Sequence, residues 1–188
     1  MTHPWLTPPA GPAAGTRAAI AAALPRIETA RLVLRAPRME DWAALAPIWT
    51  TDRAAGIGGP YAEEDGWLDF NQCIAGWILR GFGALTITTR EDGAVLGLAV
   101  LGHELGDPEP ELGWLLTAEA EGRGFATEAA AALRDWAAVH LDLPLVSYVA
   151  DGNDASARIA ARLHATRDGV HPADAEVAVW RHPQGGAA

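Results

Sequence analysis

Residues 118–130, AEAEGRGFATEAA, join an apolar run to an alanine-rich segment through a short loop that contains two glycines. The backbone N–H groups of residues 122–126 can converge on the oxygens of an anion at the start of the helix that follows. Glycine suits such a loop, because the absence of a Cβ lets the backbone approach its ligand closely. The residue types and their spacing therefore predict a phosphate-binding loop.

Two common phosphate-binding motifs fit this loop poorly. A nucleotide P-loop requires a lysine, and the chain contains none. The dinucleotide fingerprint requires a third small residue at the position where Thr127 stands, so only Gly122 and Gly124 match it. The loop therefore predicts an anion site without identifying the anion.

The apolar residues of the first half predict the elements that precede this loop. A half-buried strand is expected in ETARLVLRAP, and helical stripes run from Met39 to Trp49 and from Trp67 to Trp77. Pro47 should end or kink the first of these helices. The runs FGALTITTR and AVLGLAVLGHE are joined by EDG, whose Asp-Gly pair is typical of an antiparallel hairpin.

The second half predicts an alternation of strands and helices. The strand ELGWLL leads into the loop and a helix over 126–140, and PLVSYVA is a further strand. Asn153 or Asp154 should cap the next helix, and AEVAVWRH is expected to be the last strand. Antiparallel strands followed by strand–helix units indicate a mixed α/β fold, with helices covering a twisted central sheet.

Length, charge and composition restrict the class of protein. A chain of 188 residues suits one domain, predicted over residues 27–182, with a flexible N-terminal arm over 1–26 and a C-terminal tail over 183–188. The formal net charge of −10 argues against direct nucleic-acid binding and favours cationic partners such as amines. No apolar run has the length of a membrane span or a signal peptide, so a cytoplasmic location is expected.

Three segments together resemble a known family. ETARLVLR, ELGWLLTAEAEGRGFATEAAAAL and NDASARIAARLHA, in this order, resemble the GNAT superfamily of acetyl-CoA-dependent N-acetyltransferases, nearest to its ribosomal-protein (Rim-type) branch. The resemblance covers residues 27–182. It implies a mostly antiparallel twisted sheet with helices on both faces, and a parallel, splayed pair of strands at the cofactor cleft. It also implies transfer of an acetyl group from acetyl-CoA to a primary amine in a ternary complex.

The resemblance implies a set of cofactor-binding residues. The pyrophosphate of coenzyme A would lie on the loop before the helix, the pantetheine arm would pair with the end of the preceding strand, and an Asn-x-x-Ser motif would lie near the sulfur. An N–H donor at Leu116 would stabilise the developing oxyanion of the thioester. The implied residues are Leu115, Leu116, Thr117, Gly122, Arg123, Gly124, Phe125, Ala126, Thr127, Asn153 and Ser156.

Three residues are candidates for proton transfer. Glu111 matches an acidic position near the substrate amine in the branch that the chain resembles, and it could accept a proton directly or through water. His103 is a second candidate base by residue type. Ser156 is a candidate acid, because the tyrosine of many members is replaced by Ala160. The structural alternatives are a solvated strand-start glutamate, a surface histidine and a hydroxyl in a capping region.

Two departures from the family pattern generate further expectations. Glu121 stands where the family has Gln or Arg, so its carboxylate should turn away from the phosphates, which would repel it. His164 stands where a glycine usually closes the helix, so a histidine has to adopt the C-terminal turn there.

The sequence does not identify the amine acceptor or the oligomeric state. A protein N-terminus and a small amine both stay open as acceptors, and exposed apolar surface would be consistent with a homodimer. No metal is expected, because the chain lacks an H-E-x-x-H motif and Cys/His pairs with ligand spacing. The alternative function is a non-catalytic acyl-CoA-binding or structural domain that retains the cleft.

Overall fold

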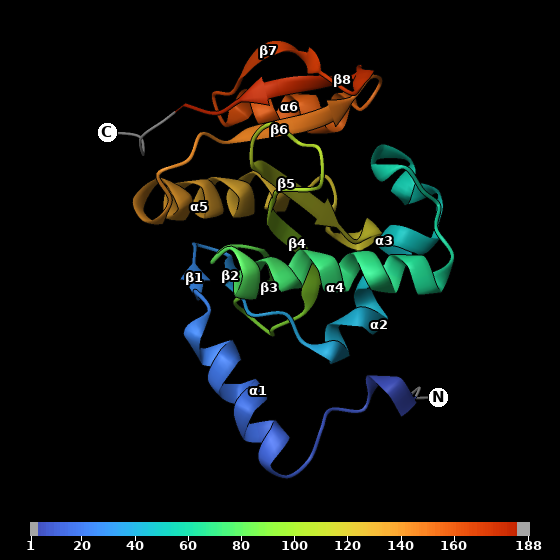
Figure 1. Cartoon of the computed structure of the whole chain (residues 1–188), viewed down its shortest axis with the longest axis vertical. Helices are drawn as coiled ribbons and strands as arrows, with labels where there is room; N and C mark the ends of the chain where they lie inside the picture. Colours follow the sequence, from blue (N-terminus) through green and yellow to red (C-terminus); the bar gives the residue numbers. More distant parts are fainter. Residues whose placement is uncertain (1–3, 184–188) are drawn as a thin grey trace.

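The computed structural model describes residues 4–183, and its strands form one eight-stranded sheet in the order β1-β2-β3-β4-β5-β6-β8-β7 (Figure 1). Among these strands, β5 and β6 pair in parallel and the other neighbours pair antiparallel. The predicted mixed α/β fold is confirmed. The strands are β1 (Ile27–Glu28), β2 (Leu32–Arg35), β3 (Ala84–Thr89), β4 (Val95–Gly102), β5 (Glu111–Leu116), β6 (Val146–Ala150), β7 (Thr166–His171) and β8 (Asp174–Arg181).

Helices cover both faces of the sheet, as expected. One hydrophobic cluster joins α5 to inward-facing residues of β2–β5, and a second joins α2, α3 and α4 to Leu98 and Val100 of β4. In Figure 1, α4 crosses in front of β3 and β4. The helices are α1 (Pro12–Ala23), α2 (Trp42–Leu45), α3 (Pro47–Thr50), α4 (Glu63–Leu79), α5 (Phe125–His140) and α6 (Asp154–Arg162), with 3-10 turns η1 (Pro4–Leu6), η2 (Met39–Asp41), η3 (Asp52–Ile57) and η4 (Ala118–Ala120).

Most predicted elements are present, and the differences have local causes. The expected helix over 39–49 is divided into η2, α2 and α3, and the second break falls at Pro47, as its missing N–H and fixed φ require. Strand β7 was not predicted. It is an exposed edge strand whose sequence, TRDGVH, has no apolar alternation, so no hydrophobic signal marked it.

Part of the predicted N-terminal arm, residues 12–23, forms the helix α1. Pro12 opens α1, where a proline is tolerated, and the alanines that follow favour the helix, although none of its residues is buried. Trp5 packs edge-on against Trp67, with ring centroids 4.9 Å apart. The domain boundaries at 26 and 182 stay predictions, and the predicted tail lies outside the described residues from 184 onward, as does the start of the arm over 1–3.

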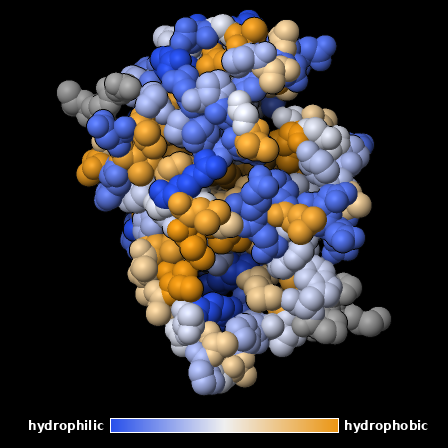
Figure 2. All heavy atoms as spheres, in the orientation of Figure 1, coloured by the Kyte–Doolittle hydropathy of each residue, from blue (hydrophilic) through white to orange (hydrophobic). Residues whose placement is uncertain are grey.

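Some large hydrophobic side chains are exposed, including Leu68, Ile78 and Leu79 of α4. Figure 2 shows hydrophobic residues in several groups on one face, separated by hydrophilic ones. Within residues 4–183, no helix is both long and apolar enough to cross a bilayer. The homodimer stays a prediction.

Helix α6 ends without glycine, as the sequence predicted. His164 has a φ of 62°, in the left-handed region, and Ala165 N–H donates to Ala160 C=O over 3.0 Å in the closing turn. A residue with a Cβ is strained in this conformation, whereas glycine is not.

Replacing His164 with glycine should therefore raise the free energy of unfolding by about 0.5–1 kcal/mol. The matched control is Ala161→Gly in the same region of α6, which should lower it by about as much, because glycine weakens a helix interior. Urea denaturation of both variants checks the two signs. Equal destabilisation by both substitutions would contradict strain at His164.

Candidate active site

The predicted phosphate-binding loop lies at the carboxyl end of β5, immediately before α5. Gly122 and Gly124 have φ values of 70° and 78°, and a Cβ added to Gly122 would meet no other heavy atom within 4 Å. Backbone conformation rather than lack of space therefore requires glycine at position 122. Glu121 N–H donates to Ala118 C=O and Glu128 N–H donates to Gly124 C=O, so the N–H groups of residues 122–127 lie between these bonds, where a helix start supplies unpaired donors.

Arg31, which lies between β1 and β2, holds this loop. Arg31 Nη1 donates to Arg123 C=O over 2.9 Å, and its Nε donates to Glu128 Oε2 over 2.7 Å. The guanidinium groups of Arg31 and Arg123 both lie over the Phe125 ring, 4.6 and 4.7 Å from its centroid. Because the Phe125 side chain is buried, this residue can offer a ligand only its backbone. Neither Arg31 nor Glu128 was predicted from the sequence as a residue of the site.

The parallel pair β5–β6 separates soon after it begins. Glu111 and Val146 are the Cα partners of its register, and Val146 N–H donates to Pro110 C=O over 3.1 Å. Beyond this point a side chain replaces the strand-to-strand bond, since Ser147 Oγ–H donates to Leu112 C=O over 2.5 Å. The expected splayed pair is therefore present, and Figure 1 shows β6, β7, β8 and α6 grouped apart from β1–β4.

A buried histidine supports the serine at this separation. Ser147 Oγ lies 2.9 Å from His182 Nε2, and both side chains are buried. Because the Ser147 proton is donated to Leu112, Nε2–H of His182 must be the donor to Oγ. Burial, and then the charge of Arg134, lower the pKa of His182 to about 4, so this imidazole is neutral at pH 7. Neither residue carried a sequence signal of this role.

The register of β5 decides which of its backbone groups face the gap. Thr117 N–H donates to Leu96 C=O of β4, so by the alternation of an antiparallel ladder Leu115 also directs its N–H and C=O to β4. Leu112, Trp114 and Leu116 direct theirs to the separated side. Of the three strand residues implied by the resemblance, only Leu116 has its backbone at the gap. Trp114, which was not predicted, joins it.

The Asn-x-x-Ser motif lies at the carboxyl end of β6, across the gap from the loop. Asn153 Oδ1 accepts from Ser156 N–H over 3.1 Å, which confirms the predicted cap of α6. A Cβ on Gly56 of η3 would come within 2.8 Å of Asn153 Nδ2, so η3 packs directly on this cap. Ser156 is partly buried in the first turn of α6.

Glu111 lies at the opposite end of the separated strands, where β5 begins. Its carboxyl group is partly buried, and desolvation raises its pKa to about 7, opposed by the backbone N–H of Tyr148 and assisted by the negative charges of Glu104 and Asp107. A carboxyl group with this pKa is suited to accept a proton near neutral pH. The structure does not bring Glu111 next to Ser156, since they stand at opposite ends of β6.

His103 follows β4 and is held by the loop that leads to Glu111. Its Nε2 lies 3.0 Å from Asp107 C=O, so this nitrogen is the donor and the ring fastens the loop. Gly102 and Glu111 are Cα partners in the sheet, which places His103 near the start of β5. This loop-fastening contact agrees with the structural alternative for His103.

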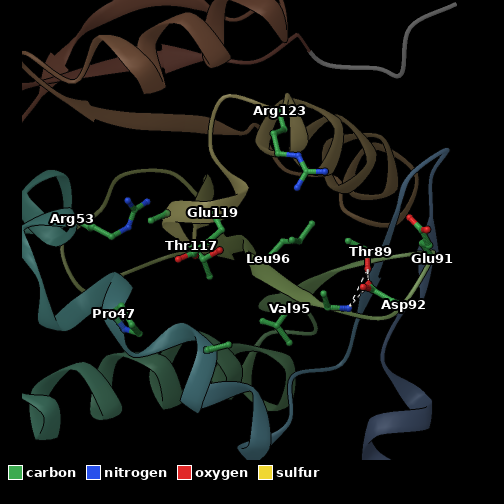
Figure 3. A pocket seen from close by; sticks show the side chains of 13 residues that line it. Pro47, Arg53, Thr89, Glu91, Asp92, Val95, Leu96, Thr117, Glu119 and Arg123 are labelled. Carbon is green, nitrogen blue, oxygen red and sulfur yellow. Dashed lines mark hydrogen bonds between the residues drawn. The ribbon is translucent and has the colours of Figure 1, made fainter.

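A hollow of about 580 Å³ opens beside the loop, on the side away from Glu111. In Figure 3, Arg53 and Arg123 line it from different elements, with Thr117 and Glu119 between them.

The carboxylate of Glu121, next to the loop, is paired with an arginine. Arg53 Nη2 donates to Glu121 Oε1 over 2.6 Å. The Glu121 side chain is 60% exposed, and its direction relative to the phosphates stays a prediction. Within residues 4–183, no group of three or more His, Cys, Asp or Glu side chains is placed to hold a metal ion.

Comparisons with known proteins agree with this arrangement. The family model of the acetyltransferase (GNAT) domain matches residues 31–166. An acetyltransferase from Agrobacterium tumefaciens is 43% identical, with a TM-score of 0.82, over 86% of this chain and 96% of that one. The ribosomal alpha-N-protein acetyltransferase RimL, solved with coenzyme A, is 19% identical, with a TM-score of 0.66, over 85% of this chain and 98% of that one. A microcin self-immunity acetyltransferase, solved with acetyl-CoA and AMP, is 15% identical, with a TM-score of 0.66, over 81% and 92% of the two chains.

The low pKa of His182 predicts a pH dependence of stability. The unfolded histidine binds a proton below its ordinary pKa of 6.5, whereas the native one resists protonation until about pH 4, so its stabilising contribution is present above pH 6.5 and is lost as the pH falls to 4. Relative to His182→Gln, the wild-type protein should lose about 3 kcal/mol of unfolding free energy over this window.

Urea denaturation at a series of pH values measures this difference. The comparison with the variant is needed because the raised pKa of Glu111 acts in the opposite direction. His140→Gln, at an exposed position, is the control. Parallel pH profiles for the wild-type protein and His182→Gln would contradict a buried, neutral His182.

Proposed function

Because the chain belongs to the GNAT acetyltransferase family, we propose that it transfers an acetyl group from acetyl-CoA to a primary amine by direct attack in a ternary complex. One observation carries the proposal. A strand with an unpaired backbone edge, β5, leads directly into a loop whose N–H groups stand at the start of a 16-residue helix. A linear thioester arm joined to a pyrophosphate needs these two features in this order.

The roles of the cosubstrate-binding residues follow from their positions. We assign the pyrophosphate to the N–H groups of residues 122–127, where the positive end of the α5 dipole adds to them. The pantetheine amides would pair with the backbone of Trp114 and Leu116, as an added strand pairs with a sheet edge. Asn153 and Ser156 are assigned to the far side of the pantetheine, because they stand across the gap at the end of β6.

Glu111 is proposed as the base. It accepts a proton from the ammonium form of the acceptor, directly or through water, and the neutral amine nitrogen then attacks the thioester carbonyl. The carbonyl oxygen gains negative charge, which a backbone N–H on the open edge of β5 stabilises, and a donor of this kind contributes about 3 kcal/mol in related acyl transfers. The C–N bond forms, the C–S bond breaks, and the thiolate leaves; the new amide nitrogen releases a proton as the thiolate takes one up. Ser156 is the candidate donor of that proton, through water, because it stands at the opposite end of β6 from Glu111.

The acceptor is proposed to be a cationic amine, either a protein N-terminus or a small molecule. The formal net charge of −10 favours the approach of such a molecule. Glu104 and Asp107, in the loop before β5, act on Glu111 as negative charges and so lie on its side of the gap. They would attract the ammonium group that has to reach Glu111.

Gly124→Val tests the assignment of the loop. Valine is poorly tolerated at a φ of 78°, so the N–H groups should no longer converge and the Kd for acetyl-CoA should rise by about tenfold or more. Gly169→Val is the matched control, because Gly169 has a φ of 91° but lies in β7. Isothermal titration calorimetry measures both. Equal affinity in the two variants would contradict phosphate binding at residues 122–127.

Glu111→Gln tests the base. In the wild-type enzyme kcat should rise with pH up to about 7, as the Glu111 carboxyl group loses its proton. The variant should lose about a hundredfold in kcat together with the inflection near pH 7. Glu104→Gln is the control. It should stay active but titrate at lower pH, because the Glu104 charge raises the pKa of Glu111. An unchanged pH profile in Glu111→Gln, measured by thiol release, would exclude this role.

A further inference from the structure

Arg53 reaches from η3 to the end of β5 and the start of the phosphate-binding loop. Its Nη2 donates to Leu116 C=O over 2.8 Å and to Glu121 Oε1 over 2.6 Å. The side chain is partly buried, with 24% of its surface exposed. A single guanidinium group therefore joins the last residue of β5 to the residue that precedes Gly122.

The position of Glu121 creates an electrostatic problem for the proposed function. Its carboxylate directly precedes the N–H groups assigned to the pyrophosphate, and like charges at short range oppose binding. A neutral or positive side chain at this position would not have this effect. The structure supplies the compensating charge from elsewhere in the chain, since the Arg53 guanidinium contacts the Glu121 carboxylate directly.

The backbone that carries Arg53 is itself fixed. Thr51 caps η3 by accepting from Arg53 N–H, and Gly56 at the other end packs on the Asn153 cap of α6. The turn η3 therefore spans from the β6 side of the gap to the β5 side. The guanidinium is delivered to Glu121 from a defined position, and Figure 3 shows Arg53 opposite Arg123 around the hollow beside the loop.

We propose that Arg53 is a positioning residue for the cosubstrate, which neutralises Glu121 and so makes the adjacent N–H groups able to hold the pyrophosphate. The inference rests on the proposed function, because it takes the pyrophosphate of acetyl-CoA as the anion. Nε of Arg53 is buried and has no hydrogen-bond partner among residues 4–183, so the guanidinium also keeps a donor that the Glu121 contact does not use. The role differs from simple capping of Leu116, because it depends on the charge of Glu121.

A double-mutant cycle separates the two roles. The variants are Arg53→Ala, Glu121→Gln and the double variant, and Arg80→Ala, an exposed arginine at the end of α4, is the control. Arg53→Ala should raise KM for acetyl-CoA about tenfold with a smaller effect on kcat, because it leaves the carboxylate without its partner. Glu121→Gln should leave KM unchanged or lower it. The double variant should return KM to within about threefold of the Glu121→Gln value.

S-acetylpantetheine, which lacks the phosphates, is the second probe. If Arg53 acts through Glu121 on the phosphates, Arg53→Ala should change KM for acetyl-CoA but leave KM for S-acetylpantetheine within about twofold of the wild-type value. Equal losses for both substrates, or a double variant no better than Arg53→Ala, would overturn the proposal and leave Arg53 as a cap of Leu116. If the wild-type protein neither binds coenzyme A in calorimetry nor releases thiol from acetyl-CoA, the proposed function itself fails, and this inference fails with it.

Discussion

A strand that loses its neighbour inside a sheet leaves backbone N–H and C=O groups that need other partners, because a buried polar group without one is costly. Strand β5 is in this position after its first contacts with β6. The hydroxyl of Ser147 bonds the C=O of Leu112, and the guanidinium of Arg53 bonds the C=O of Leu116. Between these two caps lies the backbone of Trp114. These two bonds limit the length of open edge on which a linear ligand can pair.

The separation of β5 from β6 also gives the buried polar side chains of Ser147 and His182 their hydrogen-bond partners. Ser147 Oγ–H donates to Leu112 C=O while its oxygen accepts from His182 Nε2–H, and burial keeps His182 neutral at pH 7, so no charge is buried there. Next to this contact, the backbone N–H of Tyr148 acts on the carboxyl group of Glu111. The candidate base therefore also contacts the backbone of β6 with its side chain, but its raised pKa comes from desolvation, which the Tyr148 N–H opposes.

Arginine provides local positive charge in a protein of negative net charge. The chain contains 14 arginines and no lysine. Three of these arginines, Arg31, Arg53 and Arg123, lie around the loop before α5. The fixed fork of donors on a guanidinium can contact more than one acceptor at once, as Arg31 does with Arg123 C=O and Glu128. The loop is thereby held in shape by side chains on its flanks, and its own N–H groups remain directed to a ligand.

Local sequence signals predicted much of the fold and the cofactor side of the site. The Asp-Gly hairpin, the ELGWLL strand, the loop with Gly122 and Gly124 and the cap by Asn153 each depend on a few adjacent residues, and each is present. The direction in which the backbone groups of Trp114 and Leu116 point could not be predicted from local sequence, because it depends on the register of β5 with β4. The departure at Glu121 led only to the expectation that its carboxylate turns away, because Arg53 lies 68 positions away and nothing local distinguishes it from the other arginines. His182 lies 35 positions from Ser147, and the edge strand β7 had no hydrophobic pattern.

The most direct test of this site is the change in backbone amide chemical shifts of the protein when acetyl-CoA is added, measured by NMR. We expect large shifts at Trp114, at Leu116 and at residues 122–127, because their N–H groups face the ligand. Leu115 and Thr117 should shift little, since they are bonded to β4. Shifts that are equal along residues 114–117, or confined to other surfaces while residues 122–127 stay unchanged, would contradict acetyl-CoA binding on the open edge of β5.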